Sequence, residues 1–145
     1  MNKSKKIMIA VFCIMLIAAS AMFYSCEDEN KEENVLGKGS TSFKLEVVGD
    51  KGETKVYTIK TNEETVGDAL IHNDVKLVPA ADKELGYVTT VDGLTADWSV
   101  DMSYWSFYIN GEYASLGAFD AEIEKDAAYK FEYVKETAGD EENAG

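Results

Sequence analysis

The 145-residue sequence predicts an α+β domain in which a mainly antiparallel sheet covers one short helix. Three observations lead to this fold class. Apolar and polar residues alternate, in several segments, with the two-residue period of half-buried strands. One short segment instead has the capping chemistry of a helix, and glycine-containing turn sequences separate the predicted strands.

The first two strands should pair as a hairpin. Apolar and polar residues alternate over 43–47 and again over 55–60, and a turn sequence with two glycines lies between these segments. A short helix should follow, because Thr65 suits the N-cap position and Asp68 comes three residues later. We expect this helix to end near Asn73.

The middle of the chain predicts two more strands. They correspond to short apolar runs at 75–78 and 87–91, with a loop around Pro79 between them. A turn-rich passage over 92–101 follows the second run.

The last part of the chain predicts a second hairpin and a closing strand. Asn110-Gly111 suits the two positive φ angles of a type I′ turn, so 104–109 and 112–115 should pair around it. Tyrosine and phenylalanine then alternate with other residues over 129–134, which predicts the last strand.

The strand 104–109 divides its side chains between two faces. One face is expected to lie in the core and holds Trp105, Phe107 and Ile109. The other face is either solvated or part of a recognition surface, and it holds Tyr104, Ser106 and Tyr108. Trp98, in the preceding loop, is a candidate contact for a ligand or partner.

Residues 1–25 are predicted to form an export signal. Lysines near the start precede an apolar run over 7–22. Ser25 before Cys26 resembles a lipobox, so we expect a lipoprotein that Cys26 anchors on the extracytoplasmic face of the cell membrane. The alternatives are cleavage after Ala21, which gives a secreted protein, and an uncleaved membrane anchor.

Acidic segments are expected on both sides of the domain. Residues 26–40 should form a tether, 41–134 the domain and 135–145 a disordered tail. Without its signal the chain has 27 acidic residues against 11 lysines, a net charge of −16. Such a polyanion is repelled from phosphate backbones, so nucleic acid is not an expected partner. Anionic headgroups repel it as well, so an anchor has to be covalent.

Three segments near the predicted second hairpin carry a family resemblance. They are Gly93–Asp101 (GLTADWSVD), Ser103–Trp105 (SYW) and Phe107–Ala114 (FYINGEYA). With the helix at 65–70 and the closing strand at 128–133, they resemble the transcobalamin-like C-terminal domain family. The resemblance extends over most of the predicted domain.

This resemblance implies a compact β-grasp-like fold and a ligand. In that family the domain packs over a corrinoid whose other face is held by a separate α/α toroid, and the bacterial relatives are exported or lipid-anchored. This chain carries no toroid, so the resemblance implies at most half of such a site for cobalamin or another corrinoid. A toroid-type or transporter subunit would complete it. The candidate ligand-binding residues are Trp98, Tyr104, Trp105, Tyr108, Asn110 and Gly111.

We expect a binding module and no enzymatic activity. His72, the sole histidine, has no nucleophile motif around it and is expected to be a helix-end residue rather than an axial metal ligand. Asp92, Asp97 and Asp101 offer oxygen ligands for calcium, but their spacing matches no EF-hand loop. The second hypothesis is a surface module that binds protein or cell-wall polymer through a sheet edge and the 92–101 loop.

Overall fold

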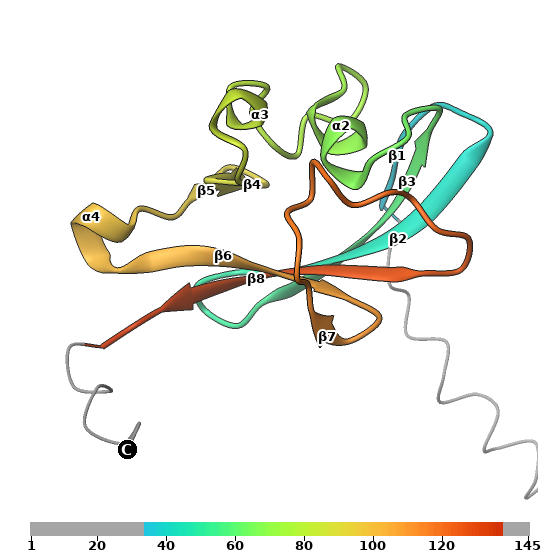
Figure 1. Ribbon diagram of the computed structural model, residues 1–145. Helices are drawn as coiled ribbons and strands as arrows, with labels where there is room; N and C mark the ends of the chain where they lie inside the picture. The colour runs from blue at the N-terminus through green and yellow to red at the C-terminus, as the bar shows by residue number, and fades with distance from the viewer. Residues whose placement is uncertain (1–33, 138–145) are drawn as a thin grey trace, which may run out of the picture. The chain divides into compact units, whose positions relative to one another are not determined.

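A mixed sheet of six strands forms one layer of the computed structural model, which describes residues 34–137 (Figure 1). The strand order is β1-β3-β2-β8-β6-β7. β1 pairs with β3 and β2 with β8 in parallel, whereas the other neighbours are antiparallel. The strands are β1 Asn34–Gly37, β2 Thr41–Val48, β3 Thr54–Thr61, β6 Ser103–Ile109, β7 Glu112–Tyr113 and β8 Ala128–Lys135.

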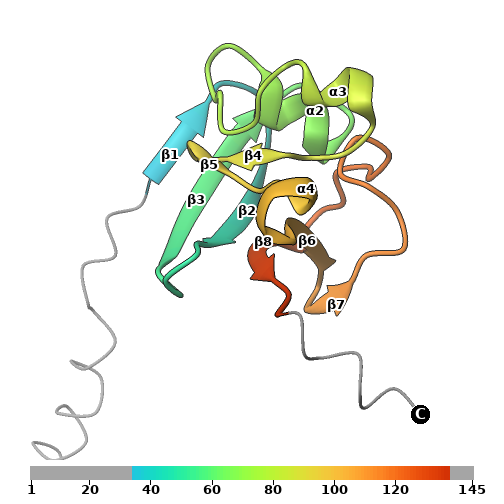
Figure 2. The same cartoon turned by 90° about the vertical axis from the view of Figure 1, so that its left-hand side faces the viewer.

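Short helices and a small hairpin lie on one face of this sheet (Figures 1 and 2). They are α2 Val66–Ile71, α3 Asp82–Leu85 and α4 Trp98–Asp101, with the paired strands β4 Thr90–Val91 and β5 Leu94–Thr95. The core fills the space between the two layers. Its largest fully buried side chains are Tyr129, Phe131, Leu45, Ile59, Leu70, Val66 and Val91.

Several local predictions are confirmed. β2 and β3 form the first hairpin, in register from Thr41 opposite Thr61 to Val48 opposite Thr54. Thr65 caps α2, because its Oγ1 accepts a hydrogen bond of 3.2 Å from the backbone N–H of Asp68.

The second hairpin also has the predicted turn. Asn110 and Gly111 have φ angles of 53° and 81°, which are the two positive values that a type I′ turn requires. The strand after this turn is shorter than the expected 112–115. β7 ends at Tyr113, although Ala114 still donates a backbone hydrogen bond to the Phe107 carbonyl.

The structure corrects the expectations for the middle of the chain. The run 75–78 is a turn, in which the N–H groups of Leu77 and Val78 both donate to the Leu70 carbonyl. Val75, Leu77 and Val78 are buried because the turn packs against the core, and so short a run could not distinguish this from a strand. Of the run 87–91 only Thr90 and Val91 are strand, and α3 lies within the expected loop.

The predicted tether of residues 26–40 extends too far. Residues 34–37 form β1, which pairs with β3 from Asn34 opposite Tyr57 to Gly37 opposite Lys60. The predicted signal, Cys26, the first part of the tether and most of the tail lie outside the described residues. The domain is therefore mostly β-sheet with few short helices, an α+β or mainly-β fold. Among its described helices, none is long and apolar enough to cross a membrane.

Candidate functional site

The candidate site lies along the outer edge of β6. On one side β6 pairs with β8 over its whole length, from Ser103 to Ile109. On the other side β7 pairs only with Tyr108 and Ile109. Within residues 34–137, no strand pairs with Ser103–Ser106 on that side.

The main chain of β6 shows which groups face this edge. The Phe107 carbonyl points away from β8, because it accepts a 2.9 Å hydrogen bond from the Ala114 N–H on the β7 side. Alternate residues of an antiparallel strand point their polar groups the same way, so the N–H and C=O of Trp105 also point to this side. The edge thus offers hydrogen-bonding groups beside the side chains described next.

A hollow of about 330 Å³ lies beside this edge, and we call it the β6 hollow. Tyr87 and Val88 form one wall, and the chain after β7, coloured orange in Figure 2, forms the other. The two walls come together where a Cβ on Gly117 would lie 3.5 Å from the Gly86 carbonyl oxygen. The full lining is Tyr87, Val88, Tyr104, Trp105, Phe107, Tyr113, Ser115, Leu116, Gly117, Ala118 and Phe131.

Large apolar side chains are exposed around the β6 hollow. Tyr87 is 61% exposed, Tyr113 68% and Leu116 43%. Side chains of this size cost hydrophobic free energy in water, and where several of them gather they commonly mark a binding surface.

Trp98 extends this surface at the start of β6. It is the first residue of α4, whose N-terminus is capped by the Asp97 carboxylate through the Ser99 N–H at 2.9 Å. Its ring is 55% exposed and lies 6.0 Å from the ring of Tyr104, which also lines the hollow. Trp98 and Tyr104 therefore form an aromatic pair at one end of the hollow.

Trp105 has a different role from Trp98. Its side chain is only 8% exposed, and its indole Nε1 donates a 3.2 Å hydrogen bond to the Leu94 carbonyl. The ring also packs edge-on against Tyr133 and Phe131. The indole is part of the core and holds the β4–β5 hairpin to the sheet.

The remaining predicted site residues lie at the far end of β6. The Tyr108 ring contacts Tyr113 at 5.7 Å, and the Lys130 ammonium lies 4.3 Å from its centroid. Asn110 holds the start of β8, because its N–H donates to the Ala128 carbonyl at 2.7 Å and its Oδ1 accepts from the Ala128 N–H at 2.9 Å. Apart from Trp98, the predicted set therefore lies along β6 and its turn, with Tyr104 and Tyr108 about 13 Å apart at the rise of a β-strand.

The carboxylates that were candidate calcium ligands have separate partners. Asp92 pairs with Lys55 at 2.5 Å, and Asp101 accepts hydrogen bonds from Ser103 and Lys135, which lower the pKa of its carboxyl group. Burial, with the hydrogen bond to Asp92, raises the pKa of Tyr57 to about 12. Across residues 34–137, no three His, Cys, Asp or Glu side chains gather closely enough to hold a metal ion.

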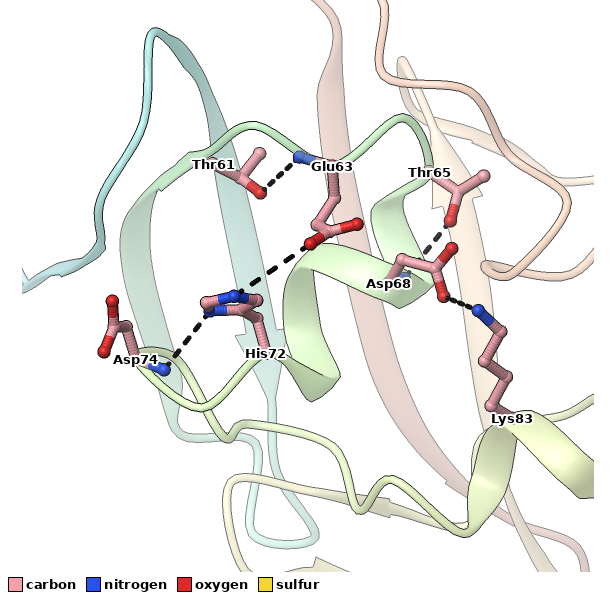
Figure 3. Close-up of polar contacts among 7 residues, drawn as sticks. All are labelled: Thr61, Glu63, Thr65, Asp68, His72, Asp74 and Lys83. Carbon is pink, nitrogen blue, oxygen red and sulfur yellow. Dashed lines mark hydrogen bonds and ion pairs between the residues drawn. The ribbon is translucent and has the colours of Figure 1, made fainter.

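His72 lies at the C-terminal end of α2 (Figure 3). Its Nδ1 accepts from the Asp74 N–H at 3.4 Å, and its Nε2 lies 4.0 Å from a Glu63 carboxylate oxygen. On the other side of α2, Lys83 pairs with Asp68 at 2.6 Å. These contacts hold the short helix to the loops that flank it and to α3.

Sequence reasoning missed the walls of the β6 hollow. Tyr87 was assigned to a strand that does not form there, and Leu116 was assigned no role. Tyr113 could have been found, because two-residue hairpin pairing places it opposite Tyr108. The approach of the 87–88 segment to β6 depends on tertiary structure, and no local pattern in the sequence signals it.

Fold and site together define a small α+β domain with an aromatic hollow at the edge of its sheet. Comparison with family models assigns the chain to a known family. It belongs to the family described as Domain of unknown function (DUF4430), whose model matches residues 63–135.

Solved structures that are similar to this chain have low sequence identity to it. One is a "putative metal binding protein" from Ruminococcus gnavus, which is 20% identical with a TM-score of 0.56; the match covers 68% of this chain and 100% of that one. Another is haptocorrin in complex with Cbi, 21% identical with a TM-score of 0.49, where the match covers 66% of this chain but only 25% of that one. A search of curated proteins finds no match.

Proposed function

We propose that this protein is an exported, lipid-anchored binding module without enzymatic activity, and that the β6 hollow holds a small amphipathic ligand. One observation carries the proposal: three large, exposed apolar side chains, Tyr87, Tyr113 and Leu116, surround a hollow that already exists in the folded chain. Ligand sites in proteins are mostly apolar hollows of about 300–1,000 Å³ with a few polar groups, and the β6 hollow lies in this range.

A corrinoid is the first ligand to test. The sequence segments that resemble the transcobalamin-like C-terminal domain family include Trp98, Tyr104 and Trp105, which lie at the hollow or beside it. The order β3-β2-β8-β6-β7, with the last strand in the middle of the sheet, supports the β-grasp-like assignment that this resemblance implies. The hollow is open to solvent on one side, so a toroid-type or transporter subunit would supply the other half of a corrinoid site.

Isothermal titration of residues 27–145 with cobalamin and cobinamide tests the proposal. We expect saturable heat that is lost in a Tyr87→Ala/Tyr113→Ala variant, because these truncations remove two large exposed side chains from the lining of the hollow. Val35→Ala is the matched control, since Val35 is an apolar side chain 46% exposed at the opposite edge of the sheet. If no heat appears at high micromolar ligand, with or without a toroid-type partner, the corrinoid assignment is wrong.

A second function is favoured by the open edge of β6. Natural proteins often use charged residues or proline to protect edge strands from pairing, and Ser103–Ser106 contain neither. A protein partner could add a strand there, with the 92–101 loop beside it. Pull-down from membrane extract separates the two functions, because a stable protein partner that needs no small molecule favours this one.

A further inference from the structure

A second hollow, of about 360 Å³, lies between the turn after α2 and the β4–β5 hairpin. We call it the α2–β4 hollow, and it shares no lining residue with the β6 hollow. Its lining is Ile71, Asn73, Lys76, Leu77, Val78, Pro79, Ala80, Thr90 and Gly93. Its size also falls within the range of small-ligand sites.

Hydrogen bonds fix both walls of the α2–β4 hollow. The N–H groups of Leu77 and Val78 donate to the Leu70 carbonyl at 3.0 and 3.3 Å, which holds the turn against α2. The Asp92 N–H donates to the Leu77 carbonyl at 2.8 Å, which holds the hairpin against the turn. A ligand therefore meets walls that are already in place, and the ordering cost of binding is reduced.

The charge in this hollow is opposite to that of the chain. Lys76 is the sole ionisable residue in the lining, although the chain has a net charge of −13. The carboxylate of Asp92, next to Gly93 in the lining, already pairs with Lys55 at 2.5 Å. The Lys76 ammonium therefore gives the hollow a preference for anions, while Ile71, Pro79 and Ala80 offer accessible apolar surface.

Lys76 has a backbone conformation that is unusual for a lysine. Its φ angle is 51°, in the left-handed region that glycine and asparagine adopt at lower cost than a lysine. A glycine would relieve this strain and lose only the side chain. Asp92, Met102, Asn110 and Asp126 also have positive φ angles, so it is the position of Lys76 in the hollow, and not this strain, that points to a role for its ammonium group.

We propose that the α2–β4 hollow binds a small amphipathic monoanion, with its carboxylate or similar head at Lys76 and its apolar body against Ile71, Pro79 and Ala80. The amide of Asn73 and the hydroxyl of Thr90 lie in the same lining and supply further hydrogen-bonding groups to the head. This site is independent of the proposed function, because it shares no lining residue with the β6 hollow.

Titration of the mature protein with octanoate and with octanol tests this site. Octanoate should bind saturably, and octanol should bind roughly tenfold or more weakly because it lacks the charge that Lys76 recognises. Lys76→Gly should weaken octanoate binding to the same extent while the protein remains at least as stable to urea, because the strain is removed. Lys76→Arg should retain most of the affinity, and Lys125→Gln, a lysine outside the lining, serves as control.

Three results would overturn the proposal: equal binding of octanoate and octanol, unchanged octanoate binding in Lys76→Gly, or no octanoate binding at millimolar concentration. If Lys76→Gly fails to fold, Lys76→Asn replaces it, since asparagine also tolerates a positive φ angle. Octanoate binding should persist in the Tyr87→Ala/Tyr113→Ala variant. A lack of ligand binding at the β6 hollow can therefore be distinguished from a lack of octanoate binding at the α2–β4 hollow.

Discussion

Trp98 and Trp105 lie seven residues apart and have opposite environments. Trp105 follows the strand alternation that assigned it to the core, and its indole is buried and hydrogen-bonded to Leu94. Trp98 begins a four-residue helix and leaves more than half of its surface in water. At the scale of a residue, the core role of Trp105 and the proposed recognition role of Trp98 predict different costs of truncation.

Trp105→Ala should lower the free energy of unfolding by about 3–5 kcal/mol through lost burial and the cavity that remains. Trp98→Ala should lower it by less than about 1.5 kcal/mol, because an exposed ring loses little packing when it is truncated. Denaturant melts of both variants measure the two values. Equal and large losses would make Trp98 a core residue and remove it from the proposed surface.

Tyr57 gives the domain a distinctive response to alkali. Burial and the Asp92 contact raise its pKa in the folded chain to about 12, above the value of 10.0 for a solvated tyrosine. Below pH 10 the phenol is neutral in both the folded and the unfolded chain, and its full contribution to the free energy of unfolding is present. This contribution of about 2–3 kcal/mol is lost as the pH rises toward 12. Urea melts of the wild type and Tyr57→Phe from pH 9 to pH 12 test this. The stability of the wild type relative to the variant should fall over that range, and a constant difference would contradict the account.

At the scale of elements, the sequence predicted structure well where a local rule decided it. Thr65 capped the expected helix, and Asn110-Gly111 formed the expected turn, because caps and type I′ turns depend on a few neighbouring residues. It failed at 75–78 and at β1. There, tertiary packing decides whether a short apolar run is a strand and whether residues in a polar segment pair with a sheet edge.

Helix α2 offers a test of close packing between elements. A Cβ on Gly67 would meet the ring of Phe119 and would lie 2.9 Å from the Phe119 Cα. Gly67→Ala should therefore destabilise the domain by about 1–3 kcal/mol through overpacking, although alanine has the higher helix propensity. Chemical denaturation gives the value, and adding Phe119→Ala should recover part of the loss. A stabilised Gly67→Ala variant would show that the helix can move away from the loop at 118–121.

At the scale of the whole molecule, strand order and the walls of the site were beyond sequence reasoning. The alternation in β2 and β8 predicted two strands but not their parallel pairing, which depends on how the chain crosses between them. The β6 hollow likewise depends on Tyr87 and Leu116, which line it from segments that are far apart in the sequence. The residues that carry the family resemblance identified one part of this surface, and the structure adds the opposing walls.

The proposed location of the molecule depends on Cys26. If this cysteine becomes the lipidated first residue of the mature chain, Cys26→Ala should release the protein into the medium or leave an unprocessed precursor. Metabolic labelling with a fatty acid and fractionation of cells measure both outcomes, and Ser25→Thr is a milder control at the neighbouring position. Unchanged processing and membrane retention of Cys26→Ala would favour cleavage after Ala21 or an uncleaved anchor.

The central claim is that the β6 hollow is a ligand site, and amide NMR of residues 27–145 during titration with cobinamide tests it most directly. The account predicts that shifted signals concentrate in 87–88, 103–107 and 113–118, and that the Trp98 indole signal moves with them. Shifts confined to other segments, such as β1 and β3, would contradict this location. The absence of any shift up to the solubility limit of the ligand would contradict the corrinoid assignment itself.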